Sequence, residues 1–175
     1  ARSLAATSEE NDVLFVNVGD PSLSLREQGY ASTLHIEPSL SQYVGAAVTW
    51  HTREGAERWA VVHDDSADMN LAAKSASHWI AASGGEVTEV LHVAAGQPVY
   101  FEESERIAAS GADAVLLLLE PADQIAFMGQ FRSGGAELVL VPVPLPVTQT
   151  RDFLSASLVR RGLQEPQARI VPFEP

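Results

Sequence analysis

The run Ala114-Val115-Leu116-Leu117-Leu118-Leu119 decides the fold, because it is apolar throughout and is bounded by Gly111 and Pro121. A strand at the edge of a sheet would be expected to show polar residues in alternation. This run instead predicts a strand buried on both faces, with Val115–Leu119 at the centre of a mainly parallel sheet. Three similar runs lie at a spacing of roughly 25–30 residues along the chain: Trp59–His63, Val87–Val93 and Leu138–Val143.

Segments with helical character separate these runs, and they end at glycines that favour helix termination. They are Ser66–Ser83, Phe101–Ser110 and Pro121–Ser133. The alternation predicts an α/β fold, with a mainly parallel sheet and helices on both faces. Further predicted elements are strands at Val13–Val18 and Thr33–Ile36, a helix from Pro38 toward Gly55 with the proline in its first turn, a helix at about Arg151–Gly162 and a final strand at Ile170–Phe173. The proline-rich run Pro142–Pro146 predicts a loop or an edge.

Composition excludes several classes of partner. The 175 residues carry a formal charge of −12 with a single lysine, Lys74, so the chain repels nucleic acid and anionic membrane surfaces. No stretch approaches the ~20 apolar residues of a membrane span, which predicts no membrane insertion. The absence of cysteine excludes disulfides and thiolate chemistry, and it fits a reduced cytosol and a disulfide-free periplasmic protein equally well.

Enzymatic motifs do not stand out. The five histidines form no H-x-x-x-H or H-x-H pair, no serine lies in G-x-S-x-G, and no glycine-rich phosphate loop follows a strand. The best acid/base candidate is His63 beside Asp64 at a strand end, but adjacent residues of a strand point to opposite faces. We therefore expect no enzyme, no cofactor and no metal site.

Five segments together resemble the middle portion of type I periplasmic solute-binding proteins, the leucine/isoleucine/valine-binding class. They are Gly19–Tyr30, Thr33–Gln42, Arg58–Asp64, Gly84–Val87 and Ser110–Val115, the last reading Ser-Gly-Ala-Asp-Ala-Val. Within the class, Leu14–Gly19, Leu34–Ser39 and Arg58–His63 look most like the subgroup encoded beside pyrroloquinoline-quinone (PQQ)-dependent alcohol dehydrogenases. The resemblance covers nearly the whole chain, but only the middle of the family, which implies a flavodoxin-like lobe that is incomplete at both ends.

The resemblance implies an organisation and a function. Residues 1–45 would be the end of the first lobe and the crossover, 46–146 the βα units of the second lobe, and 147–175 a terminal helix and strand. The chain would be a non-enzymatic, exported or periplasmic binding component of an ABC-type uptake or sensing system, with an ABC permease as a possible partner. Two alternatives remain open: an intracellular ligand-sensing module of the same fold, and a small flavodoxin-like hydrolase or transferase.

The ligand-contact positions implied by the resemblance lie in loops at strand ends, and the rule that open parallel sheets bind ligands beyond the carboxyl ends of their strands selects much the same loops. They are Gly19, Asp20, Asp64, Asp65, Ser66, Asp68, Glu120, Pro121 and Pro144. Simpler structural roles compete with ligand contact. Asp64, Asp65 and Ser66 stand where a helix needs a cap, Asp20 is equally an ordinary loop residue, and Glu120-Pro121 is equally a strand-to-helix turn.

The ligand is predicted from charge and from resemblance, and the two disagree. Asp68 stands where relatives often have an aromatic contact and Met69 replaces their common glycine, which weighs against amino-acid binding, while the subgroup implies PQQ, a tricarboxylate. The carboxylates of the loops oppose an anion, and Arg26 or Arg53 would have to offset them, so local charge favours a zwitterionic or cationic, amino-acid-like molecule.

Two further expectations concern packing. Exposure of the Val13–Val18 strand predicts self-association. Core spacing predicts that Trp50, Trp59 and Trp79 are packing residues.

Overall fold

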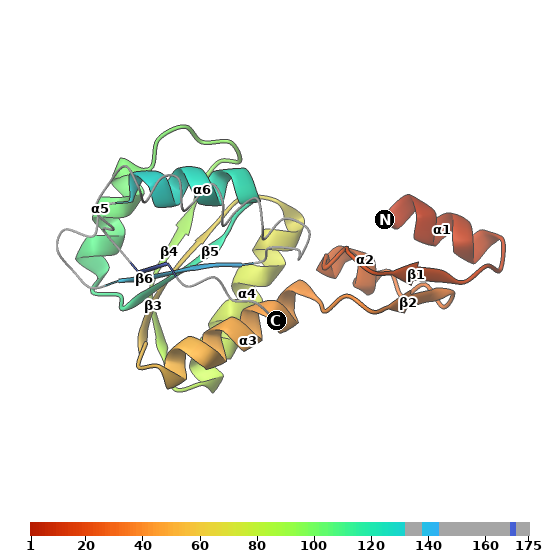
Figure 1. Cartoon of the computed structure of the whole chain (residues 1–175), viewed down its shortest axis with the longest axis horizontal. Helices are drawn as coiled ribbons and strands as arrows, with labels where there is room; N and C mark the ends of the chain where they lie inside the picture. Colours follow the sequence, from red (N-terminus) through yellow and green to blue (C-terminus); the bar gives the residue numbers. More distant parts are fainter. Residues whose placement is uncertain (132–137, 144–168, 171–175) are drawn as a thin grey trace.

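The computed structural model describes residues 1–131, 138–143 and 169–170 of the chain. Its larger sheet has the strand order β4-β3-β5-β6-β7, and every pair of neighbours is parallel. Its strands are β3 (Arg58–His63), β4 (Glu86–His92), β5 (Ala114–Leu118), β6 (Val139–Pro142) and β7 (Arg169–Ile170). The parallel α/β fold is confirmed, and β5 is the central strand as its apolar run predicts (Figure 1).

Helices cover both faces of this sheet. Helices α3 (Leu40–Arg53) and α4 (Ala67–Ala82) lie on one face, and α5 (Phe101–Ser110) and α6 (Pro121–Gln130) on the other (Figure 1). Strand β5 supplies both cores in alternation: Leu116 and Leu118 pack with α3 and α4, whereas Val115 and Leu117 pack with the α5 and α6 side. The sheet and its four helices form the body of the molecule.

Helix boundaries follow their caps. The N-cap of α3 is Ser39, whose hydroxyl accepts the Gln42 N–H, while the Gln42 side chain accepts the Ser39 N–H. Pro38 therefore precedes the helix, and its expected place in the first turn is wrong. Helix α5 has its predicted bounds, and its C-cap is Gly111, whose φ of 71° is left-handed. Helix α6 ends at Gln130, three residues before the expected Ser133.

A smaller part, the arm, extends from the body (Figure 1). It comprises α1 (Arg2–Glu10), β1 (Phe15–Asn17), α2 (Leu23–Glu27) and β2 (Thr33–His35), and β1 pairs with β2 in parallel. Sequence patterns did not predict α1 or α2. Each buries a single residue, Ala5 in α1 and Leu25 in α2, so neither has an apolar stripe.

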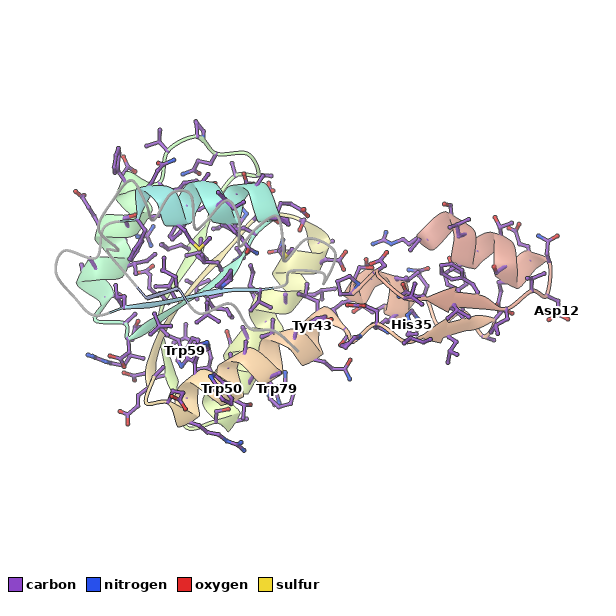
Figure 2. All side chains as sticks on the ribbon, in the orientation of Figure 1. Asp12, His35, Tyr43, Trp50, Trp59 and Trp79 are labelled. Carbon is purple, nitrogen blue, oxygen red and sulfur yellow. The ribbon has the colours of Figure 1, made fainter. Side chains whose placement is uncertain are left out.

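The three tryptophans do not share one role. Trp59 is fully buried in the core beneath α3 and α4, as expected. Trp50 is 53% exposed, so the prediction that it packs in the core is wrong. Trp79 is partly buried and lies against Gly45 of α3 (Figure 2).

Some expectations fall outside the described residues. They are the helix at Arg151–Gly162, the part of the proline run beyond Val143, and the end of the last strand after Ile170. Strand β6 ends at Pro142, and the two described residues of β7, Arg169 and Ile170, pair with Val139 and Leu140 of β6. Among the helices that the structure describes, none is long and apolar enough to cross a bilayer.

Candidate functional site

A cavity of about 710 Å³ lies where the arm meets the body, at the carboxyl ends of β3 and β5. The arm contributes α1 residues and the loop after β1, and the body contributes the first turns of α3, α4 and α6. The lining residues are Ala1, Arg2, Ser3, Asp20, Pro21, Ser22, Leu40, Ser66, Asp68, Met69, Leu119, Glu120 and Pro121.

The structure brings five of the nine expected site residues together in this cavity: Asp20, Ser66, Asp68, Glu120 and Pro121. Gly19, Asp64 and Asp65 do not line it. Pro144 lies outside the described residues. The strand-end rule thus selected loops that converge in space, although they lie about a hundred residues apart in sequence.

The side chain of Asn17 builds the arm's contribution to the cavity. Its Oδ1 accepts the Asp20 N–H at 3.0 Å and the Gly19 N–H at 3.4 Å, and its Nδ2 donates to the Asp20 carbonyl at 2.7 Å. Asp20 in turn accepts the Ser22 N–H at 2.9 Å. Asn17 is buried and was not among the expected residues, although an Asn at a strand end favours a turn, because its side chain bonds to backbone groups a few residues further on.

Asp64 and Ser66 organise the start of α4. The Asp64 carboxylate is 1% exposed and accepts the Ser66 N–H at 2.8 Å, while the Ser66 hydroxyl accepts the Met69 N–H at 3.3 Å. Ser66 is therefore the N-cap of α4, and Asp64 holds the backbone of that cap residue; of the two, Ser66 also lines the cavity. Nδ1 of His63 lies 2.8 Å from the backbone carbonyl of Asp64, so that nitrogen is engaged with the backbone.

Asp68 joins the arm to the body. Its Oδ1 accepts the backbone N–H of Ser24 in α2, and its Oδ2 accepts the Ser24 hydroxyl, both at 2.9 Å. The guanidinium of Arg2 donates to the same hydroxyl. The carboxylate at the mouth of α4 thus has a partner for each oxygen.

The charge around the cavity differs from the sequence expectation. Asp64 and Asp65 do not line it, and the oxygens of Asp68 are engaged, so fewer carboxylates oppose an anion than the loops suggested. Arg2 lines it, and nothing in the sequence pattern indicated that residue. The cations considered for an anion lie elsewhere: Arg26 donates to the Glu37 carbonyl, and Arg53 lines a separate groove beside Trp50 and Trp79.

Gln124 ties together the strand ends behind the cavity. This fully buried side chain of α6 donates through Nε2 to the Leu119 carbonyl at 2.7 Å and the Val143 carbonyl at 3.3 Å. Sequence reasoning did not select it. Over the described ranges, no three His, Asp or Glu side chains gather where they could hold a metal ion.

Comparisons with known proteins agree with this fold. A family model described as periplasmic binding protein matches residues 1–156. The chain belongs to the periplasmic binding protein family, as the resemblance predicts, and the family is one of binding proteins rather than enzymes. No match was found among curated proteins.

Three solved structures illustrate the likeness. A solute-binding protein of an ABC transporter from Rhodopseudomonas palustris, in complex with 4-hydroxybenzoate, has a TM-score of 0.66 at 19% identity over 80% of this chain. A substrate-binding protein from Desulfitobacterium hafniense in complex with Leu has a TM-score of 0.67, at 15% identity over 93% of this chain. A Rhodospirillum rubrum protein assigned to branched-chain amino acid ABC transport has a TM-score of 0.72, at 12% identity over 97% of this chain. The chain spans 39%, 53% and 47% of these three proteins, in that order.

Proposed function

We propose that the chain is part of an exported solute-binding component of an ABC-type uptake or sensing system, with an ABC permease as partner. The observation that carries the proposal is the cavity at the carboxyl ends of β3 and β5, which arm and body line jointly. In this proposal residues 1–45 form the end of a first lobe and the crossover, 46–146 the second-lobe units and 147–175 a terminal helix and strand. A ligand in such a cavity would contact both parts at once.

The proposed ligand is a small amino-acid-like molecule. Its ammonium would lie near the carboxylates of Asp20 and Glu120, and its carboxylate near Arg2 and the Ser66 hydroxyl. Two of the similar proteins were solved with molecules that carry a carboxylate, 4-hydroxybenzoate and Leu, which supports this class of ligand. An aromatic carboxylate is the second candidate, because Arg2 in the lining can pair with a carboxylate and one of the similar proteins was solved with 4-hydroxybenzoate. PQQ, implied by the subgroup resemblance, is the third.

Calorimetric titration separates these ligands. We expect leucine to bind, and isoamylamine, which is leucine without its carboxylate, to bind at least about tenfold more weakly, because it gives up the charged partner of Arg2. Replacing Glu120 by Gln should weaken leucine more than 4-hydroxybenzoate, since only leucine has an ammonium. Submicromolar binding of PQQ, a tricarboxylate, by the unmutated chain would contradict the charge argument, because Asp20 and Glu120 line the cavity.

An intracellular ligand-sensing module of the same fold is the alternative, and the complete reading frame distinguishes the two. A signal peptide ahead of the matched region supports the exported component, whereas a DNA-binding or kinase segment supports the sensor. The small hydrolase or transferase finds no support in a family of binding proteins.

We also propose that this chain self-associates through one face of the arm. Five apolar side chains alternate onto that face, and they are between 38% and 67% exposed: Leu14, Val16, Val18, Leu34 and Ile36. Val16 pairs with Leu34 across the two strands, and α1 packs against both strands. An uncharged contiguous patch is self-complementary, so a second copy can cover it. Sedimentation should give a dimer that Leu34→Asp dissociates, and a strict monomer at micromolar concentration would contradict the proposal.

A further inference from the structure

We propose that Asp68 is a positioning residue that fixes the arm to the body at the mouth of the cavity, and that it acts on the ligand only through this contact. The inference rests on the proposed function, because the cavity is the proposed binding site. It departs from the sequence expectation, which placed Asp68 among the ligand contacts.

The contact satisfies a helix end that has no cap of its own. Ser24 is the second residue of α2, and its N–H belongs to the first turn, where a helix offers no backbone acceptor. Ser22 is the N-cap, but its side chain makes no capping hydrogen bond. The acceptor comes instead from α4, because Asp68 Oδ1 lies 2.9 Å from the Ser24 nitrogen. The start of α2 is therefore capped by the other part of the molecule.

The Ser24 hydroxyl makes a second hydrogen bond to Asp68, as the donor. The Ser24 hydroxyl accepts from the Arg2 guanidinium, so its single proton is directed to Asp68 Oδ2 at 2.9 Å. The hydrogen bonds from Arg2 to Ser24 and from Ser24 to Asp68 thus link α1, α2 and α4. A carboxylate acceptor makes these bonds stronger than neutral ones.

The contact controls residues that line the cavity. Asp20 and Ser22 lie four and two residues before Ser24, on the loop that Asn17 shapes. The arm also meets the body where the Leu40 N–H donates to the Pro21 carbonyl at 2.8 Å. If the hydrogen bonds between Ser24 and Asp68 are lost, the Leu40–Pro21 backbone hydrogen bond still joins the two parts at this point. The loop that carries Asp20 can then take other positions relative to Ser66 and Glu120.

Three variants separate positioning from direct contact. Asp68→Ala removes both hydrogen bonds. Asp68→Asn keeps an acceptor, Oδ1, for the Ser24 N–H, but it removes the charge and the acceptor of the hydroxyl proton, because its Nδ2 can only donate. Ser24→Ala removes the hydroxyl bond and keeps both the charge and the amide. Glu105→Ala is the matched control for loss of a charge, because Glu105 is an exposed residue of α5 far from the cavity.

Two readouts are needed, exchange of the residue 24 backbone amide in the ligand-free chain and leucine affinity by calorimetry. We expect Asp68→Ala to speed that exchange about tenfold and to weaken leucine binding about tenfold. Ser24→Ala should have smaller effects on both readouts, and Glu105→Ala should change neither. Asp68→Asn should keep most of the protection of the Ser24 amide and most of the leucine affinity, because it still accepts the Ser24 N–H.

Two results would overturn the inference. One is unchanged exchange at Ser24 in Asp68→Ala. The other is an Asp68→Asn variant that keeps Ser24 protected but loses leucine as fully as Asp68→Ala does, because the charge would then act on the ligand directly. If the unmutated chain binds neither leucine nor 4-hydroxybenzoate, the proposed function fails, while exchange at Ser24 still decides whether Asp68 holds the arm.

Discussion

Nδ2 of Asn17 lies 3.0 Å from Nδ1 of His35, and the two residues are also register partners across β1 and β2. Because an amide nitrogen can only donate, Nδ1 of His35 accepts, and its proton resides on Nε2. Burial and, to a smaller extent, the charge of Arg26 lower the pKa of His35, against an opposing effect of Asp20. The pair therefore requires the neutral imidazole.

The first prediction is a loss of stability on mild acidification. The pKa of His35 is lower in the folded chain than in the unfolded chain, so the unfolded chain binds more protons between the two values. The stabilisation is complete above the unfolded pKa of about 6.5 and declines as the pH falls toward the folded pKa. The urea concentration at the unfolding midpoint should therefore fall as the pH is lowered from 7.5 to 5.5. His35→Asn, which keeps an acceptor without titrating, should reduce the slope, and an equal slope in both chains contradicts the assignment.

The second prediction concerns Asn17 itself. Asn17→Ala should destabilise the chain by about 1–3 kcal/mol, because it leaves the Asp20 N–H and carbonyl without the partners they have now. The same variant should weaken ligand binding, since Asp20 lines the cavity. Chemical denaturation measures the first effect. A change within about 0.5 kcal/mol, the usual range for surface substitutions, would mean that the loop holds its shape without this side chain.

The third prediction tests the close packing of α3 on α4. A Cβ at Gly45 would lie 2.6 Å from Cε2 of Trp79, so Gly45→Ala must displace the indole. Overpacking costs about 1–3 kcal/mol, and the better helix propensity of alanine offsets up to about 1 kcal/mol. A net loss with a shift in tryptophan fluorescence is expected. In a Trp79→Leu background the same substitution should be neutral or stabilising, and an undiminished cost there contradicts the clash.

The fourth prediction concerns the amino-terminal ends of β3 and β5, at the end of these strands opposite the cavity. Asp113 accepts the backbone N–H of Arg58 at 2.9 Å and the Arg58 guanidinium at 2.7 Å, and the guanidinium bond is the main cause that lowers the pKa of Asp113. This stabilisation is present above the unfolded pKa of about 3.9 and is lost as the pH falls through the lower folded value.

Asp113→Asn should remove that acid dependence at a cost of about 1 kcal/mol at pH 7, because solvent screens a pair whose side chains are 32% and 50% exposed. Denaturation series from pH 6 to 3 compare the two chains. Parallel curves would show that Asp113 does not contribute to acid unfolding.

The body was predictable because its signals are local. Strand β5 is buried on both faces, so every residue of its run had to be apolar, and α5 carries its own glycine stop. The arm was only partly predictable, since α1 and α2 each bury one residue and owe their places to contacts with β1, β2 and α4. The exposed Trp50 shows the reverse error, because spacing along a helix does not say which side faces solvent.

The same distinction divides the site. Ser66 and Glu120 were predictable because they follow β3 and β5, neighbouring parallel strands whose carboxyl ends lie together, whereas Asp20 follows β1 of the separate two-stranded sheet and reaches the cavity only through the placement of the arm. Ser24 and Asp68 are separated by 44 positions and Arg2 and Ser24 by 22, so no local pattern announces their hydrogen bonds. Asp64 was selected correctly as a strand-end residue, yet its carboxylate turns inward to the Ser66 N–H and lies outside the cavity lining.

The central claim is that the cavity between arm and body receives a small carboxylate. The most direct measurement is the change in backbone amide resonances of the chain on titration with leucine. We expect the largest shifts at Asp20, Ser66 and Glu120, which come from three separate elements around the cavity. Shifts confined to the groove at Trp50 and Trp79, or no shifts with either leucine or 4-hydroxybenzoate at millimolar concentration, would contradict the claim.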